Sequence, residues 1–170
     1  MQIELLTTYL KDHLAGSVAA IELVDHLIKI TKGGERERFF VELGEEIRED
    51  QEILRQLLND LGGKESQARK AAAWLTEKLG QVKLRLDDPG SGQLLLLEAF
   101  ETLELGIQGK RLLWRGLELV AHRVPQLRPL DLPRLQQRAD DQAQRVETQR
   151  LQVASTAFAP DDARTTAPSR

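Results

Sequence analysis

Four long stretches of the chain place apolar residues at alternating steps of three and four, the spacing that puts side chains on one face of an α-helix. These stretches cover about residues 3–30, 36–61, 93–121 and 132–158. A helix with one apolar stripe buries that stripe against other helices. The sequence therefore predicts an all-α protein built as a four-helix bundle.

Turn signals separate the stretches and indicate how they are connected. Gly33 with Gly34 ends the first stretch, Gly62 with Gly63 ends the second, and Asp131 is a candidate N-cap for the last. Short connections make the first and second helices antiparallel, and likewise the last two. Between the pairs, about residues 62–92 contain a shorter amphipathic stretch at 66–86 that is long enough to return the chain along the bundle. We therefore expect an up-down-down-up order with a short helix in the crossover.

Composition limits the class of protein further. The chain of 170 residues is long enough for one domain, which we place at residues 1–158, followed by a polar, Pro-containing tail at 159–170 that we expect to be disordered. A net charge of -3 and a pI near 5.7 give no electrostatic footprint for nucleic acid. With no cysteine, no signal-peptide pattern and no apolar run long enough to span a membrane, we expect a soluble cytoplasmic protein. Surplus apolar positions at Leu5, Leu23 and Ile30 allow a homodimer without requiring it.

Each apolar stripe is interrupted by polar residues, and the interruptions lie at similar heights. Counted from one end of the bundle, they agree to within roughly two helical turns. A buried charge must be paired or bound to a metal, so this layer is the most informative feature of the chain. We predict a buried polar network made of His13, Ser17, Asp50, Lys110, Gln142 and Gln149.

Two hypotheses account for the layer. In the first, Lys110 neutralises Asp50 or Glu101, and the glutamines bridge between the helices. In the second, a pair of metal ions is held by carboxylates, as in bundles that combine Glu residues with Glu-x-x-His motifs. The sequence contains no Glu-x-x-His, and a central lysine adds positive charge beside the metals, so we favour the first. His13 is then a core residue that donates to Asp50, while under the second hypothesis it is a metal ligand.

Several glycines lie inside the predicted helices, where each costs about 1 kcal/mol relative to alanine. They include Gly16, Gly44, Gly106 and Gly109, and the sequence "GIQGK" places two of them directly before Lys110. Close approach of two helices is one explanation. Room for a small ligand beside Lys110 is the other.

The stretches "YLKDHLAG", "EEIREDQEIL", "AAAWLTEKLGQVKL", "LGIQGKRLLWRGL" and "RADDQAQRVETQRL" span nearly the whole chain in a distinctive order. With them the chain resembles a family of uncharacterised bacterial ferritin-like proteins, which implies a ferritin-like bundle. More distantly it is similar to the YciF-type ferritin-like stress proteins. That similarity implies a carboxylate set for iron or manganese at Glu22, Glu46, Asp50, Glu101 and Glu147.

The leading functional hypothesis is a ferritin-like bundle without an intact di-iron motif, non-catalytic and stress-related, with a charged and amide network at its centre. The first alternative is a di-metal carboxylate protein that acts in iron handling or oxidation through altered ligands. The second alternative is a homo-oligomeric interaction module. Metal content and oligomeric state distinguish the three.

Overall fold

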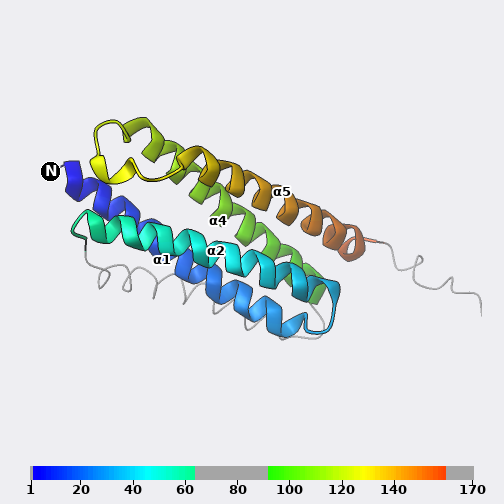
Figure 1. Cartoon of the computed structure of the whole chain (residues 1–170). Coiled ribbons are helices and arrows are strands. Elements are labelled where there is room, and N and C mark those ends of the chain that lie inside the picture. The colour runs from blue at the N-terminus through cyan, green and yellow to red at the C-terminus, as the bar shows by residue number, and fades with distance from the viewer. Residues whose placement is uncertain (1, 64–91, 160–170) are drawn as a thin grey trace, which may run out of the picture.

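A computed structural model describes residues 2–63 and 92–159 and shows an all-α four-helix bundle (Figure 1). The helices are α1 (Gln2–Ile30), α2 (Glu35–Asp60), α4 (Gly92–Val120) and α5 (Leu132–Ala157), with a short 3-10 helix, η2 (Pro125–Leu127), before α5. The described ranges contain no strand, which confirms the predicted class. Within the same ranges no helix is long and apolar enough to cross a membrane.

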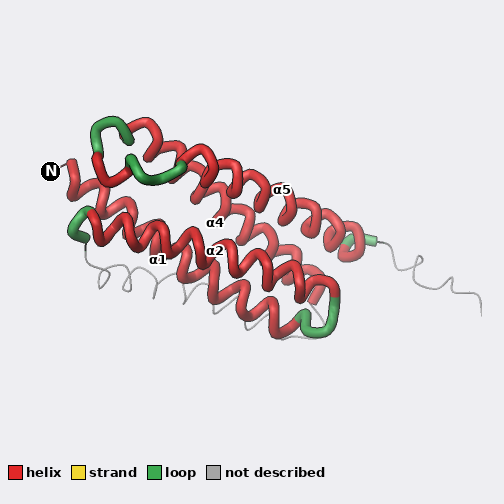
Figure 2. The backbone as a smooth tube through the Cα atoms, in the orientation of Figure 1, coloured by secondary structure: helices red, strands yellow, loops and turns green. Residues whose placement is uncertain are grey.

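The helices run in the predicted directions. Figure 1 shows α1 and α5 pointing one way along the bundle and α2 and α4 pointing the other way. A tight turn joins α1 to α2, and a longer connection through η2 joins α4 to α5 (Figure 2). Each of these pairs packs closely along its length, and α1 lies beside α4. The predicted helix at 66–86 and the tail from residue 160 lie outside the described residues.

Local sequence signals fix the helix ends to within one residue of the prediction. Asp131 caps α5, because its Oδ1 accepts a hydrogen bond from the backbone N–H of Arg134 at 3.1 Å. Gly33 and Gly62 follow α1 and α2 with φ of 85° and 75°, a left-handed conformation in which a residue without a Cβ is least strained.

The core consists of two apolar clusters stacked along the bundle. The first surrounds the α1–α2 turn and includes Phe40 stacked on Phe100 with ring centroids 5.2 Å apart. The second surrounds Trp114 and extends to Leu127 of η2. Burial of each large apolar side chain contributes about 1.5–3 kcal/mol, so both clusters stabilise the bundle. The predicted stripe of α2 is confirmed, since its buried residues include Phe40, Leu43, Ile47, Asp50, Leu54 and Leu57.

One predicted surface position is wrong. Leu23 is 0% exposed and belongs to the first cluster, whereas Leu5 and Ile30 are exposed as expected. The reason is that α1 packs against both α2 and α4, and a helix with two neighbours buries a wider face than one stripe. Leu23 is therefore not available for contact with a second copy of the chain.

Candidate functional site

A polar layer separates the two apolar clusters at the middle of the bundle. Its central contact joins α2 to α4: Lys110 Nζ donates to Asp50 Oδ2 at 2.5 Å. Lys110 also donates to the side-chain oxygen of Gln142 on α5. The Asp50 side chain is 3% exposed and Gln142 is 0% exposed, so three helices meet in a contact that is screened from water.

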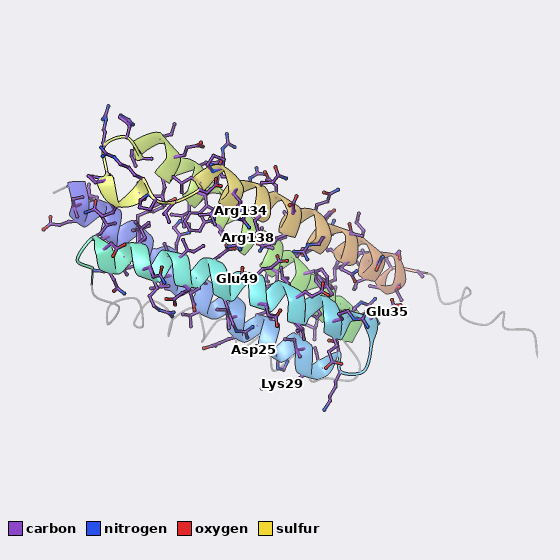
Figure 3. The ribbon with its side chains drawn as sticks, in the orientation of Figure 1. Asp25, Lys29, Glu35, Glu49, Arg134 and Arg138 are labelled. Atoms are coloured by element: carbon purple, nitrogen blue, oxygen red, sulfur yellow. The ribbon has the colours of Figure 1, made fainter. Side chains whose placement is uncertain are left out.

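Arg138 of α5 completes the surroundings of Asp50. One guanidinium nitrogen donates to Asp50 Oδ1, and another donates to Glu49 Oε2 at 2.8 Å. Figure 3 shows Arg138 and Glu49 directed toward each other from α5 and α2. Both carboxylate oxygens of Asp50 therefore accept hydrogen bonds from cations.

Gln142 extends the network toward Glu46. Its Nε2 donates to Glu46 Oε2 at 2.8 Å while its oxygen accepts from Lys110, so the amide bridges a carboxylate and an ammonium group. Arg145 donates to the same Glu46 oxygen at 2.5 Å. A continuous chain of polar contacts then runs from Arg145 through Glu46, Gln142, Lys110 and Asp50 to Arg138.

Burial and the neighbouring Asp50 carboxylate have opposite effects on the pKa of Lys110. Desolvation lowers the pKa of Lys110 from its ordinary value, because a buried ammonium loses hydration, and the Asp50 carboxylate raises it again by attraction and by hydrogen bonding. Removal of a partner from a buried ion pair leaves an uncompensated charge, which is strongly destabilising. The contact between Lys110 and Asp50 therefore depends on both of its charged members being present.

The remaining members of the predicted network lie outside this chain of contacts. Ser17 Oγ donates to the Leu14 carbonyl at 2.7 Å and accepts from Gln51 Nε2 at 2.9 Å, which links α1 to α2. His13 packs edge-on against Tyr9 with ring centroids 4.6 Å apart. Gln149 is half-buried and lines a separate pocket near Arg36 and Gln152. The hydrogen bonds to Asp50 come from Lys110 and Arg138 rather than from His13.

The carboxylates implied by the family resemblance are distributed over several contacts. Glu101 and Glu147 both pair with Arg150, at 3.6 Å and 2.6 Å, and their side chains are 52% and 43% exposed. Glu22 is half-buried on α1, while Glu46 and Asp50 are held by the cations described above. Across residues 2–63 and 92–159, no three His, Asp or Glu side chains group closely enough to hold a metal ion.

The sequence-based prediction did not include three members of the layer: Glu49, Arg138 and Arg145. They flank the apolar stripes instead of interrupting them, and their long side chains reach inward from the flank. A usable signal was present, because Arg138, Gln142 and Arg145 share one face of α5 and stand opposite Glu46, Glu49 and Asp50 on one face of α2.

A cavity adjoins the polar layer on its α1 and α4 side. It has a volume of about 350 Å³ and is lined mainly by apolar atoms, with α2 contributing Ile47 and Leu54. Tyr9 and His13 of α1 and Trp114 of α4 supply aromatic side chains, and Asp12, Ser17, Asp50, Gln51 and Lys110 supply the polar ones. The cavity is thus a mostly apolar space with a few polar groups, which is the usual character of a small-molecule site.

Glycines on both walls keep this cavity open. Gly16 of α1 and Gly106 and Gly109 of α4 line it, and a Cβ atom added at any of the three would meet no atom within 4 Å. Gly44 of α2 differs, because an added Cβ would lie 3.0 Å from Val24 and from Arg48. Close helix approach therefore explains Gly44, whereas the other three leave space unfilled.

Comparisons with known proteins gave no relative for this chain. No protein-family model matches it, and neither the curated proteins nor the solved structures contain a significant match. A functional conclusion accordingly depends on the polar layer and the cavity.

Proposed function

We propose that the chain is a ferritin-like bundle in which a charge network takes the central position of a metal site, and that it acts without catalysing a reaction. The helix directions support the topology, since an up-down-down-up bundle needs one long crossover between its second and third main helices (Figure 1). The contact that carries the functional proposal is the one between Lys110 and Asp50 at the centre of the bundle.

The charges around that contact argue against a metal ion in the same place. Asp50 already accepts from Lys110 and Arg138, and Glu46 already accepts from Gln142 and Arg145. A divalent cation bound by Asp50 would lie next to the Lys110 ammonium group, where repulsion is strong in a weakly polar interior. These residues therefore fit a network in which Lys and Arg side chains neutralise the carboxylates better than they fit a pair of metal ions.

Elemental analysis tests the proposal directly. The full chain is purified from cells supplied with iron and manganese, alongside the Glu46→Ala, Glu101→Ala double variant. We expect well below one metal ion per chain in both proteins. About two metal ions per wild-type chain, lost in the double variant, would show that the centre is a metal site and would overturn the network.

A stability comparison tests the role of the lysine. We expect Lys110→Met to lower the free energy of unfolding by about 3–5 kcal/mol, because it leaves the buried Asp50 carboxylate short of a partner. Arg111→Met is the matched control, since Arg111 is the next residue and pairs with Asp140 at 2.9 Å on the surface. Exposed pairs contribute at most about 1 kcal/mol, so equal losses in the two variants would contradict the proposal.

One observation favours self-association as a second function. Leu105, Leu112 and Leu119 recur every seven residues on α4 and are 73%, 59% and 78% exposed. Leucines repeated at this spacing on one face of a helix fit a second copy of the chain, since exposed apolar side chains gathered on one face mark interaction sites. Light scattering across a hundredfold range of concentration should show a dimer that Leu112→Glu disrupts. A monomer at every concentration would exclude this function.

A further inference from the structure

The cavity between α1 and α4 has no role in the charge network, although Asp50 and Lys110 border both. We propose that it binds a small, neutral, largely aromatic molecule that carries one hydrogen-bond-accepting oxygen. This inference goes beyond the proposed function, because it depends on the space and chemistry of the cavity and not on the absence of a metal.

The first step concerns the free energy that the open space costs. A glycine inside a helix costs about 1 kcal/mol relative to alanine. At Gly16, Gly106 and Gly109 the space that an alanine Cβ would occupy is left empty. Packing does not require a missing Cβ at any of these positions, because nothing lies within 4 Å. Because Gly16 is on α1 and Gly106 and Gly109 are on α4, the missing side chains widen the cavity from both helices.

The second step concerns size and polarity. A volume of about 350 Å³ lies at the small end of the range of about 300–1,000 Å³ that is usual for ligand pockets. The lining is mostly apolar, with Tyr9, His13 and Trp114 offering ring faces and edges. Aromatic rings pack favourably in offset or edge-to-face arrangements, of which Tyr9 and His13 already make one. An aromatic body of one or two fused rings suits this space.

The third step identifies the hydrogen-bonding partners. Ser17 and Gln51 are already bonded to each other, and the oxygens of Asp50 are occupied. An ammonium group has three N–H donors, and Lys110 donates to Asp50 and Gln142, which leaves one donor within the part of the chain that the structure describes. Burial lowers the pKa of His13, so its imidazole stays neutral at pH 7 and offers a further N–H. Both groups suit an acceptor oxygen.

The fourth step excludes a net charge on the ligand. The charged lining residues are Asp12, Asp50 and Lys110, and Lys110 is already balanced by Asp50. A carboxylate or phosphate ligand would face the acidic Asp12 and Asp50, and among the described lining residues Lys110 is the one cation and is already paired. A cationic ligand at the inner end would face the ammonium group of Lys110, and Asp50 is already paired with both Lys110 and Arg138. A neutral molecule avoids both costs, which are largest at the buried end of the cavity beside Asp50 and Lys110.

A fluorescent ketone provides the probe. 6-Propionyl-2-(dimethylamino)naphthalene is neutral and aromatic, and its emission responds to polarity and to hydrogen bonding at its carbonyl oxygen. We expect it to bind the full chain saturably, with one molecule per chain and a blue-shifted emission. Its analogue without the propionyl group should bind several-fold more weakly in competition, and the anionic 1-anilinonaphthalene-8-sulfonate at least tenfold more weakly.

Glycine variants locate the binding site. Gly109→Leu and Gly106→Leu fill the cavity and should weaken binding of the ketone at least tenfold, and Gly109→Ala should weaken it less. Gly116→Leu is the control, because Gly116 lies on α4 outside the cavity and an added Cβ there also meets nothing within 4 Å. Thermal melts of each variant confirm folding, and we expect no fall in melting temperature for Gly109→Ala.

Two results would overturn the inference. The first is equal binding of the ketone by the Gly109→Leu and Gly116→Leu variants. The second is tighter binding of the anionic probe than of the ketone. Metal analysis is unaffected by any of these results, so failure here is distinguishable from failure of the proposed function.

Discussion

The interface between α2 and α5 and the interface between α1 and α4 lie on opposite sides of the bundle and use space in opposite ways. Between α2 and α5, long charged side chains fill the gap, as Arg138 reaches Glu49 (Figure 3). Arg138 also reaches Asp50, and Arg145 reaches Glu46. Between α1 and α4, glycines leave a cavity of about 350 Å³. Substitutions should therefore be costly on the first side and tolerated on the second.

The largest expected effect comes from Asp50, the acceptor for both Lys110 and Arg138. Asp50→Ala should lower the free energy of unfolding by about 3–5 kcal/mol, because a buried ammonium group loses its counter-charge. Urea denaturation followed by circular dichroism measures this loss. Asp140→Ala is the surface control and should change stability by no more than about 1 kcal/mol, since Asp140 pairs with Arg111 in water.

A double variant separates the pair from its members. Asp50→Ala together with Lys110→Met removes both charges of this pair, so its cost should be smaller than the sum of the two single costs by about 1–3 kcal/mol. If the losses of unfolding free energy in the two single variants simply add in the double variant, the two residues do not stabilise each other. The contact between them would then not be the centre of the charge network.

A smaller loss is expected at Arg138. Arg138→Met removes the donors to Glu49 and Asp50, but Lys110 remains beside Asp50, so we expect about 1–3 kcal/mol from the charged hydrogen bonds alone. Arg134 is exposed one turn earlier on α5 and supplies the control (Figure 3). The same denaturation measurement should show little change for Arg134→Met. Equal effects at the two positions would mean that α2 and α5 are not held together by these contacts.

On the cavity side, we expect a substitution to raise the free energy of unfolding instead of lowering it. Gly109→Ala should raise the free energy of unfolding by about 1 kcal/mol, because the new methyl group gains helix propensity and meets no neighbour. At Gly44 the methyl group would press on Val24 at 3.0 Å, so Gly44→Ala should gain less or lose stability. Thermal denaturation of both variants gives the comparison, and a greater gain at Gly44 would contradict the assignment of the glycines.

The smallest effect concerns pH at the edge of the cavity. Burial lowers the pKa of His13 below the ordinary value of 6.5, so on acidification the unfolded chain takes up a proton before the folded chain does. Stability contributed by this group is therefore present above pH 6.5 and decreases as the pH falls toward the folded pKa. Unfolding measured from pH 7.5 to 5.5 should show a shallower decline for His13→Gln than for wild type.

The residues that the sequence revealed are those that interrupt an apolar stripe. Asp50, Lys110 and Gln142 occupy stripe positions, and helical periodicity alone places them in the interior. Arg138 and Arg145 were missed because they lie beside the stripe and enter the layer through the length of their side chains. Periodicity reports the direction of a side chain, and it does not report how far that side chain extends.

The cavity was beyond the same kind of reasoning. The glycines were visible in the sequence, but close helix approach and open space both account for a glycine in a helix. Only the distance between α1 and α4 decides between them, and that distance is set by packing over the whole bundle. Leu23 was misplaced for a related reason, because one stripe does not show how many neighbours a helix has.

The contacts of the polar layer also join residues that are far apart in the chain, with 60 positions between Asp50 and Lys110 and 89 between Glu49 and Arg138. Contacts at such separation form after the local pairing of neighbouring helices, because closing a long loop costs more entropy. Loss of a contact absent from the folding transition state accelerates unfolding and leaves the folding rate nearly unchanged. The layer would then set the lifetime of the folded protein, while the two helical hairpins set the speed at which it forms.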